Sequence, residues 1–134
     1  MITQQDADKI LKRFIPQLKL KEWEILMYVL PVDVYQGTHG KDFSFETHGC
    51  TEIDELCEKA VVFIRDDLSK EQLVDTIRHE LCHLVTHKYD SYVRKVATHV
   101  DSKKLKKVLE EEGMWEMEIN VSKLANILKG LGVS

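Results

Sequence analysis

Two histidines and a glutamate near the middle of the chain have the spacing of a metal site. Residues 79–83 are His-Glu-Leu-Cys-His, an H-E-x-x-H motif. On a helix, residues four apart lie on one face, so both imidazoles can bind one cation, and Glu80 projects beside it. Neutral imidazole is a good zinc ligand, and a site with three protein ligands keeps a position open for water. The motif predicts Zn²⁺ held by His79 and His83, with Glu80 as the general base that takes the proton of the zinc-bound water.

The sequence around the motif predicts the helix that positions it. Ser69 and Gln72 form an S-x-x-Q capping box, which predicts a helix from residue 70 to about residue 87. Its apolar residues share one arc, and the two histidines of the motif lie on the opposite side. These apolar residues are Leu73, Val74, Ile77, Leu81, Leu84 and Val85. The histidines are therefore not expected to fill the same core.

A third ligand has to come from another part of the chain. His87 continues the spacing, but it lies about 12 Å along the helix axis from His79 and is a poor candidate for the same ion. A second helix is predicted over about residues 114–129, where the apolar residues Met117, Val121, Leu124 and Leu128 form one stripe. Glu116 and Glu118 flank this stripe, and the helical pattern alone leaves both open as the third ligand.

These motifs together resemble those of a known family over roughly residues 20–130. The segment HELCHLVTH is followed, about 35 residues after His83, by the segment Glu118-Ile-Asn-Val-Ser-Lys-Leu-Ala of the second predicted helix. This arrangement is similar to the small gluzincin-type zinc peptidases, including minigluzincins and ImmA/IrrE-like domains, whose later helix carries E-x-x-(A/V)-(N/S)-x-(F/L)-A. The resemblance implies a zincin-like fold in which Glu118 is the third zinc ligand. It also implies that a strand at residues 61–65 forms the sheet edge along the cleft and pairs with an extended substrate.

The rest of the chain predicts a small sheet preceded by a helix. Thr3 and Asp6 are typical of a helix start, and Pro16 is expected to break that helix. Residues 23–30 (WEILMYVL) are rich in β-formers and apolar on both faces, so we expect a strand covered on both sides.

Two further strands are predicted before the H-E-x-x-H helix. Phe43 and Phe45 alternate with polar residues, and residues 60–65 (AVVFIR) form an apolar run. The order of one helix, about three strands and then helices predicts an α+β fold with a small, mostly antiparallel or mixed sheet. The length of 134 residues predicts a single domain over residues 1–134.

Composition and charge exclude several classes of protein. The net charge of −4 argues against nucleic-acid binding, for which a basic surface is expected. No apolar run approaches the roughly 20 residues that span a membrane, and the polar N-terminus does not resemble a signal peptide. The three cysteines are odd in number and have no CxxC spacing, which favours free thiols in the cytoplasm. Cys82 is expected to be buried.

The predicted activity is zinc-dependent hydrolysis of a peptide or protein substrate. Larger gluzincins steady the oxyanion with a Tyr or His from a downstream subdomain, for which this chain has no room. Tyr89, Tyr92 and His99 are the nearby substitutes. The lack of an evident oxyanion residue favours an alternative, a metal-binding module with a regulatory or binding role and little proteolytic activity. The presence of Glu80 counts against this alternative, because a purely structural metal site has no use for a general base.

Overall fold

The computed structural model describes residues 1–38, 48–54, 56–98 and 103–132. Within the helices, only the backbone is described for residues 38, 88–98, 104–106, 108–110 and 112–117. The elements in chain order are α1 (Gln4–Gln17), β1 (Glu24–Leu30), α2 (Val32–Thr38), β2 (Gly49–Asp54), β3 (Lys59–Arg65), α3 (Lys70–Thr98) and α4 (Lys103–Gly130). The α+β class predicted from the sequence is therefore confirmed.

The three strands form one mixed sheet in the order β1-β3-β2. β1 runs parallel to β3, and β2 runs antiparallel to it. The prediction that residues 61–65 form the sheet edge is wrong, because β3 lies in the centre of the sheet. β2, for which the sequence predicts no strand, pairs with β3 on its other side and forms an edge. The strand predicted around Phe43 and Phe45 lies outside the described residues.

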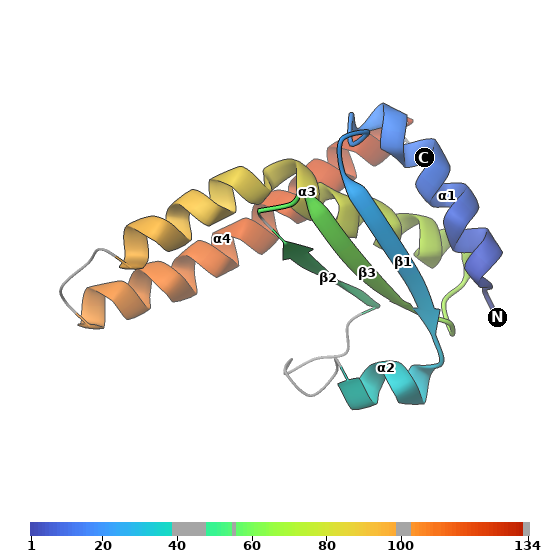
Figure 1. The fold of residues 1–134 in the computed structure, drawn as a ribbon, viewed down its shortest axis with the longest axis horizontal. Coiled ribbons are helices and arrows are strands. Elements are labelled where there is room, and N and C mark those ends of the chain that lie inside the picture. The colour runs from blue at the N-terminus through green and yellow to red at the C-terminus, as the bar shows by residue number, and fades with distance from the viewer. Residues whose placement is uncertain (39–47, 55, 99–102, 133–134) are drawn as a thin grey trace.

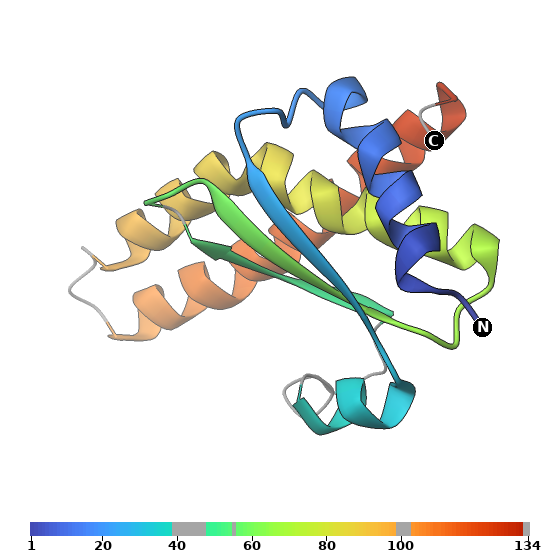
Figure 2. The same ribbon diagram turned by 45° about the vertical axis from the view of Figure 1, so that its right-hand side comes forward.

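Helices α1 and α3 lie against one face of the sheet, and α4 runs antiparallel along α3 (Figures 1 and 2). The strand residues that face α1 and α3 fill the core: Ile25, Met27, Val29, Ala60, Val62 and Ile64. On the opposite face, Leu26 is 47% exposed and Tyr28 is 45% exposed. The prediction that the first strand is covered on both sides is therefore wrong, since these two side chains of β1 are half-exposed.

The two helix starts predicted from capping residues, those of α1 and α3, are confirmed. Thr3 and Asp6 form a reciprocal capping box at α1, and Ser69 and Gln72 form another at α3. α1 ends one residue after Pro16, because proline has no N–H to bond to the carbonyl four residues before it and its ring crowds that turn.

The two long helices form a hairpin that extends beyond the sheet (Figure 1). α3 continues to residue 98 and α4 starts at residue 103, about eleven residues beyond each predicted boundary. Apolar residues at helical spacing continue into both outer turns, at Val93 and Val96 and at Leu105, Val108 and Leu109, so the predicted boundaries were too narrow. None of the helices in the described part of the chain is long and apolar enough to cross a membrane.

Candidate metal centre

α3 presents different side chains to the sheet, to α4 and to the candidate centre. Four apolar residues face the core and are buried: Leu73, Ile77, Leu81 and Leu84. Val85 was predicted on the same arc, but it is 46% exposed. His79 and His83 lie away from this core and are partly buried, with ring centroids 5.2 Å apart. The sheet-facing arc therefore fixes the rotation of α3 and leaves both imidazoles on its other side.

α4 brings Glu118 to the two histidines. Val121 and Ala125 of α4 are buried against Cys82 of α3, and the small side chain of Ala125 suits a close helix contact. Glu118 precedes these two residues by three and seven positions, so it lies on the same side of α4. Its Oε2 is 3.4 Å from Nε2 of His79, and its Oε1 is 3.2 Å from Nε2 of His83.

These separations fit a shared zinc ligand set. Ligands about 2.0–2.1 Å from a tetrahedrally bound zinc lie about 3.3 Å from one another. Both N–O distances between Glu118 and the histidines are close to this value. The donor set of two imidazole nitrogens and one carboxylate is also one that zinc accepts in catalytic sites. Hydrogen bonds with His79 and His83 hold the pKa of Glu118 well below its ordinary value, so this carboxylate is ionised at neutral pH.

Glu80 lies beside this group and is almost fully buried, with 6% of its surface exposed. Ligand atoms of His79, Glu80 and His83 all lie within 4.8 Å of one another. The hydroxyl of Thr51 on β2 donates a 2.5 Å hydrogen bond to Oε2 of Glu80. Burial raises the pKa of Glu80, because desolvation disfavours the charged form. Glu80 is thus a fixed carboxylate of raised basicity next to the candidate ligands.

The sequence did not identify Thr51 as a site residue. β2 approaches α3 closely at Gly49, where a Cβ atom would lie 2.9 Å from Cγ2 of Thr76 and 3.0 Å from the Phe63 carbonyl oxygen. A larger residue at this position would push the start of β2 away from α3. The available signal was therefore Gly49, two positions before a threonine whose side chain points to the same face of the strand.

The pairing of β2 also fixes the direction of its backbone groups. The N–H of Arg65 donates to the carbonyl of His48, which marks residues 48 and 65 as a hydrogen-bonded pair. Hydrogen-bonded and non-hydrogen-bonded pairs alternate along an antiparallel ladder. Thr51 and Ile53 therefore belong to non-hydrogen-bonded pairs with β3, and their N–H and C=O groups point to the outer edge. In the described part of the chain, no strand pairs with that edge.

Several other predicted residues can be placed only in part. Glu116 lies on α4, and Tyr89 and Tyr92 lie on α3, but their side chains are outside the description. His99 lies outside the described residues. His87 packs edge-to-face against Trp23 with ring centroids 4.9 Å apart.

The described cysteines carry no disulfide. Cys82 is buried, as predicted, and burial raises its thiol pKa to about 11. Cys50 on β2 is partly buried, and its thiol pKa is likewise raised to about 11, chiefly by burial. Both thiols are therefore protonated at neutral pH, unlike the thiolates that attack substrates or bind metals.

The comparisons with known proteins give no match: no family model, no curated protein and no solved structure matches this chain.

Proposed function

We propose that the chain is a zinc-dependent metallopeptidase with a zincin-like arrangement, in which His79, His83 and Glu118 hold the metal. The observation that carries the proposal is the position of Glu118, whose two oxygens face the Nε2 atoms of both motif histidines. Glu118 is 35 residues from His83, so helical periodicity alone does not produce this convergence. A bound zinc ion would supply a Lewis acid that polarises a peptide carbonyl and makes a water molecule more acidic.

Glu80 is the general base in this proposal. The hydrogen bond from Thr51 fixes its Oε2, and its buried position makes it more basic than an exposed glutamate. It accepts a proton from the attacking water and then donates this proton to the leaving amine. Thr51 is a positioning residue, because it acts through Glu80.

The outer edge of β2 provides the binding surface for the substrate backbone. The side chain of Thr51 donates a hydrogen bond to Glu80, while its backbone N–H and C=O point to the outer edge of the sheet. An extended peptide that pairs with Thr51 and Ile53 would therefore pass beside the candidate base, by β-strand addition. The family resemblance implied that residues 61–65 form this edge, but in the structure the edge strand beside Glu80 is β2.

Metal analysis and one substitution test the proposal. The purified chain, reconstituted with zinc, should hold about one zinc per molecule. Glu80→Gln should keep the zinc and lose 10²–10⁴-fold in cleavage of a peptide library, because it removes only the base. Glu71→Gln, an exposed position on the same helix, is the matched control and should keep full activity.

The possible results separate the hypotheses. Less than about a tenth of an equivalent of zinc would contradict the metal site. Stoichiometric zinc without cleavage of any library peptide would instead favour the metal-binding module. Full activity of Glu80→Gln would remove Glu80 as the base.

A further inference from the structure

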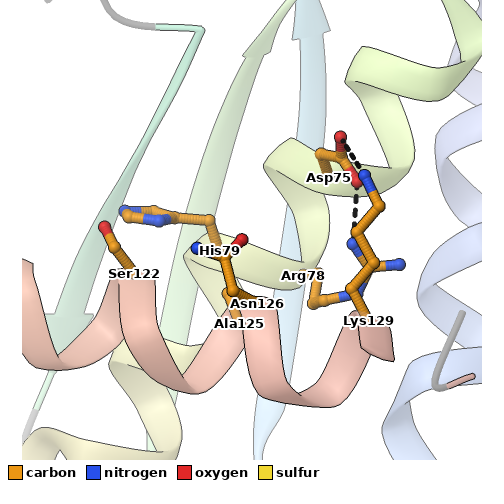
Figure 3. Close-up of a pocket in the computed structure, with 7 residues that line it drawn as sticks. All are labelled: Asp75, Arg78, His79, Ser122, Ala125, Asn126 and Lys129. Atoms are coloured by element: carbon orange, nitrogen blue, oxygen red, sulfur yellow. Dashed lines mark hydrogen bonds and ion pairs between the residues drawn. The ribbon is translucent and has the colours of Figure 1, made fainter. Parts of the chain in front are cut away.

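A polar pocket of about 260 Å³ opens between α3 and α4 next to the candidate metal centre (Figure 3). His79 and Ser122 lie at one end of it, and a charged group of three residues lies at the other. The charged residues are Asp75, Arg78 and Lys129, and Asn126 lies between the two ends. The pocket therefore connects one candidate zinc ligand with a charged cluster that the proposed mechanism does not use.

The cluster carries a net positive charge. Asp75 accepts a 2.8 Å hydrogen bond from Nη1 of Arg78 through Oδ1 and a 3.0 Å bond from Nζ of Lys129 through Oδ2. One carboxylate thus holds two cations, which leaves the three side chains with a net charge of +1. Arg78 is only 3% exposed, and its guanidinium lies 5.5 Å from the centroid of the Phe14 ring. Its charge is therefore fixed in position and poorly screened by solvent.

The distance from the charged cluster to the candidate centre is about the length of one residue of a peptide substrate. Asp75 precedes His79 by one helical turn, about 6 Å along α3. Ser122 follows Glu118 by one turn on α4, so the pocket begins where the candidate ligands end. A group bound there would belong to a residue adjacent to the peptide bond at the metal.

We propose that this pocket binds a carboxylate of the substrate, held by the charges of Arg78 and Lys129 and by the polar groups of Ser122 and Asn126. The inference rests on the proposed function, because it assigns a substrate class to the same site. The carboxylate is either the free C-terminus of a peptide or the side chain of an Asp or Glu. Both present the same anion, and Lys129, whose side chain is 48% exposed, can adjust to it.

Binding to the metal-free protein tests the pocket without any catalysis. We would titrate ¹⁵N-labelled chain with N-acetylglycine and with its neutral analogue N-acetylglycinamide, and follow the amide signals of Ser122 and Asn126. The acid should shift these signals and bind at least about tenfold more tightly than the amide, which corresponds to about 1.4 kcal/mol. Lys129→Ala should abolish this preference. Lys123→Ala removes the same charge from an exposed position of α4 outside the pocket and should leave the preference intact.

Cleavage by the zinc-loaded protein distinguishes the two sources of the carboxylate. We would compare three peptide pools: neutral peptides with a free C-terminus, amidated peptides with one Asp or Glu, and amidated neutral peptides. A roughly tenfold preference for the first pool identifies a C-terminal carboxylate, and the same preference for the second identifies an acidic side chain. Equal cleavage of all three pools overturns the inference but leaves the peptidase proposal intact.

The two measurements also separate the inference from the proposed function. Selective binding of N-acetylglycine without cleavage of any pool would support the carboxylate pocket and contradict the peptidase. Equal or absent signal shifts with the acid and the amide, or an unchanged preference in Lys129→Ala, would overturn the pocket.

Discussion

The two edges of the sheet differ in whether their outward backbone groups are hydrogen-bonded. At β1, the side-chain amide of Gln4 donates to the Met27 carbonyl at 2.7 Å and accepts from the Val29 N–H at 2.9 Å. This single side chain imitates a neighbouring strand. At β2, the outward groups of Thr51 and Ile53 meet no strand in the described part of the chain. One edge is thus closed by the first residue of α1, and the other is open beside the candidate centre.

This difference concerns which edge of the sheet is open to strand addition. Exposed edges promote unwanted pairing between chains, and proteins commonly block them. Here the blocked edge is the one far from the H-E-x-x-H motif. The open edge carries Thr51, whose side chain contacts Glu80. The peptide-binding role proposed for β2 requires such an open edge.

The largest effect is expected from removal of the candidate ligand opposite β2. Glu118→Ala leaves two histidines, so zinc affinity should fall by orders of magnitude and the metal should be lost on dialysis against a mild chelator. Zinc content after dialysis is the measurement. Glu116→Ala is the control on the same helix and should retain zinc, with stability changed by less than about 0.5 kcal/mol.

The reverse result would transfer the ligand role to Glu116. Retention of zinc in both variants would remove the gluzincin-like assignment, and the open edge of β2 would then lose its proposed use.

A smaller effect is expected where β2 contacts α3. Thr51→Val removes the donor to the buried Glu80 while keeping the shape of the side chain. The free energy of unfolding should fall by about 1–3 kcal/mol, because a buried carboxylate loses a hydrogen bond. Urea denaturation of the metal-free chain measures this change. Thr51→Ser keeps the hydroxyl and should lose less, so equal losses in both variants would contradict the role of the hydrogen bond.

The closed edge should respond to loss of its side-chain cap. Gln4→Ala opens the Met27 and Val29 backbone groups and should destabilise the chain by about 1 kcal/mol. It should also increase self-association, because the uncapped strand carries the exposed Leu26 and Tyr28. Light scattering at increasing protein concentration measures the association. Gln5→Ala, at an exposed neighbouring position, should change neither property.

The smallest effect is expected at the end of the central strand, away from both edges. Arg65 is 7% exposed and donates two hydrogen bonds to Asp67, and these bonds hold the pKa of Asp67 below its ordinary value. A carboxylate with a depressed folded pKa stabilises the fold above its unfolded pKa, and this contribution is lost as the pH falls through the folded pKa.

Asp67→Asn should therefore cost only about 0.5 kcal/mol at pH 7, because the Asp67 side chain is 40% exposed. The difference from wild type should shrink below about pH 4, where the wild-type carboxyl also becomes protonated. Denaturation at several pH values measures this trend. Glu22→Gln, at an exposed position, should show no such trend, and a pH-independent loss for Asp67→Asn would argue against the ion pair.

Local signals in the sequence predicted the elements that carry the site. The capping box at Ser69 predicted where α3 begins, and the apolar arc predicted which side of α3 packs against the sheet. The predicted stripe on α4 includes Val121, which is buried against α3, and Glu118, one of the two candidate carboxylates on that helix, lies against both motif histidines. These features depend on residues a few positions apart, which is the range over which helix patterns are informative.

Non-local features could not be predicted in the same way. β2 has the sequence GCTEID, in which only the threonine and the isoleucine are strong β-formers. The other four residues are a glycine, a cysteine and two acidic residues. The position of β2 beside β3 depends on pairing between strands. The residues within one strand do not reveal which strands lie next to it. Consequently, Thr51 and the open edge were missed, and residues 61–65 were assigned to the wrong position in the sheet.

The mixed topology also has a consequence for how the chain folds. The closest pair between β2 and β3 joins Asp54 and Lys59, five residues apart, whereas β1 pairs with β3 at an offset of 35 residues. Closing the sevenfold longer loop costs about 1.7 kcal/mol more in chain entropy. We therefore expect β2 and β3 to pair first, and β1 to join later with α1 and Gln4. The edge that is closed in the native protein is thus the last to be protected, and Met27→Ala should accelerate unfolding more than it slows folding.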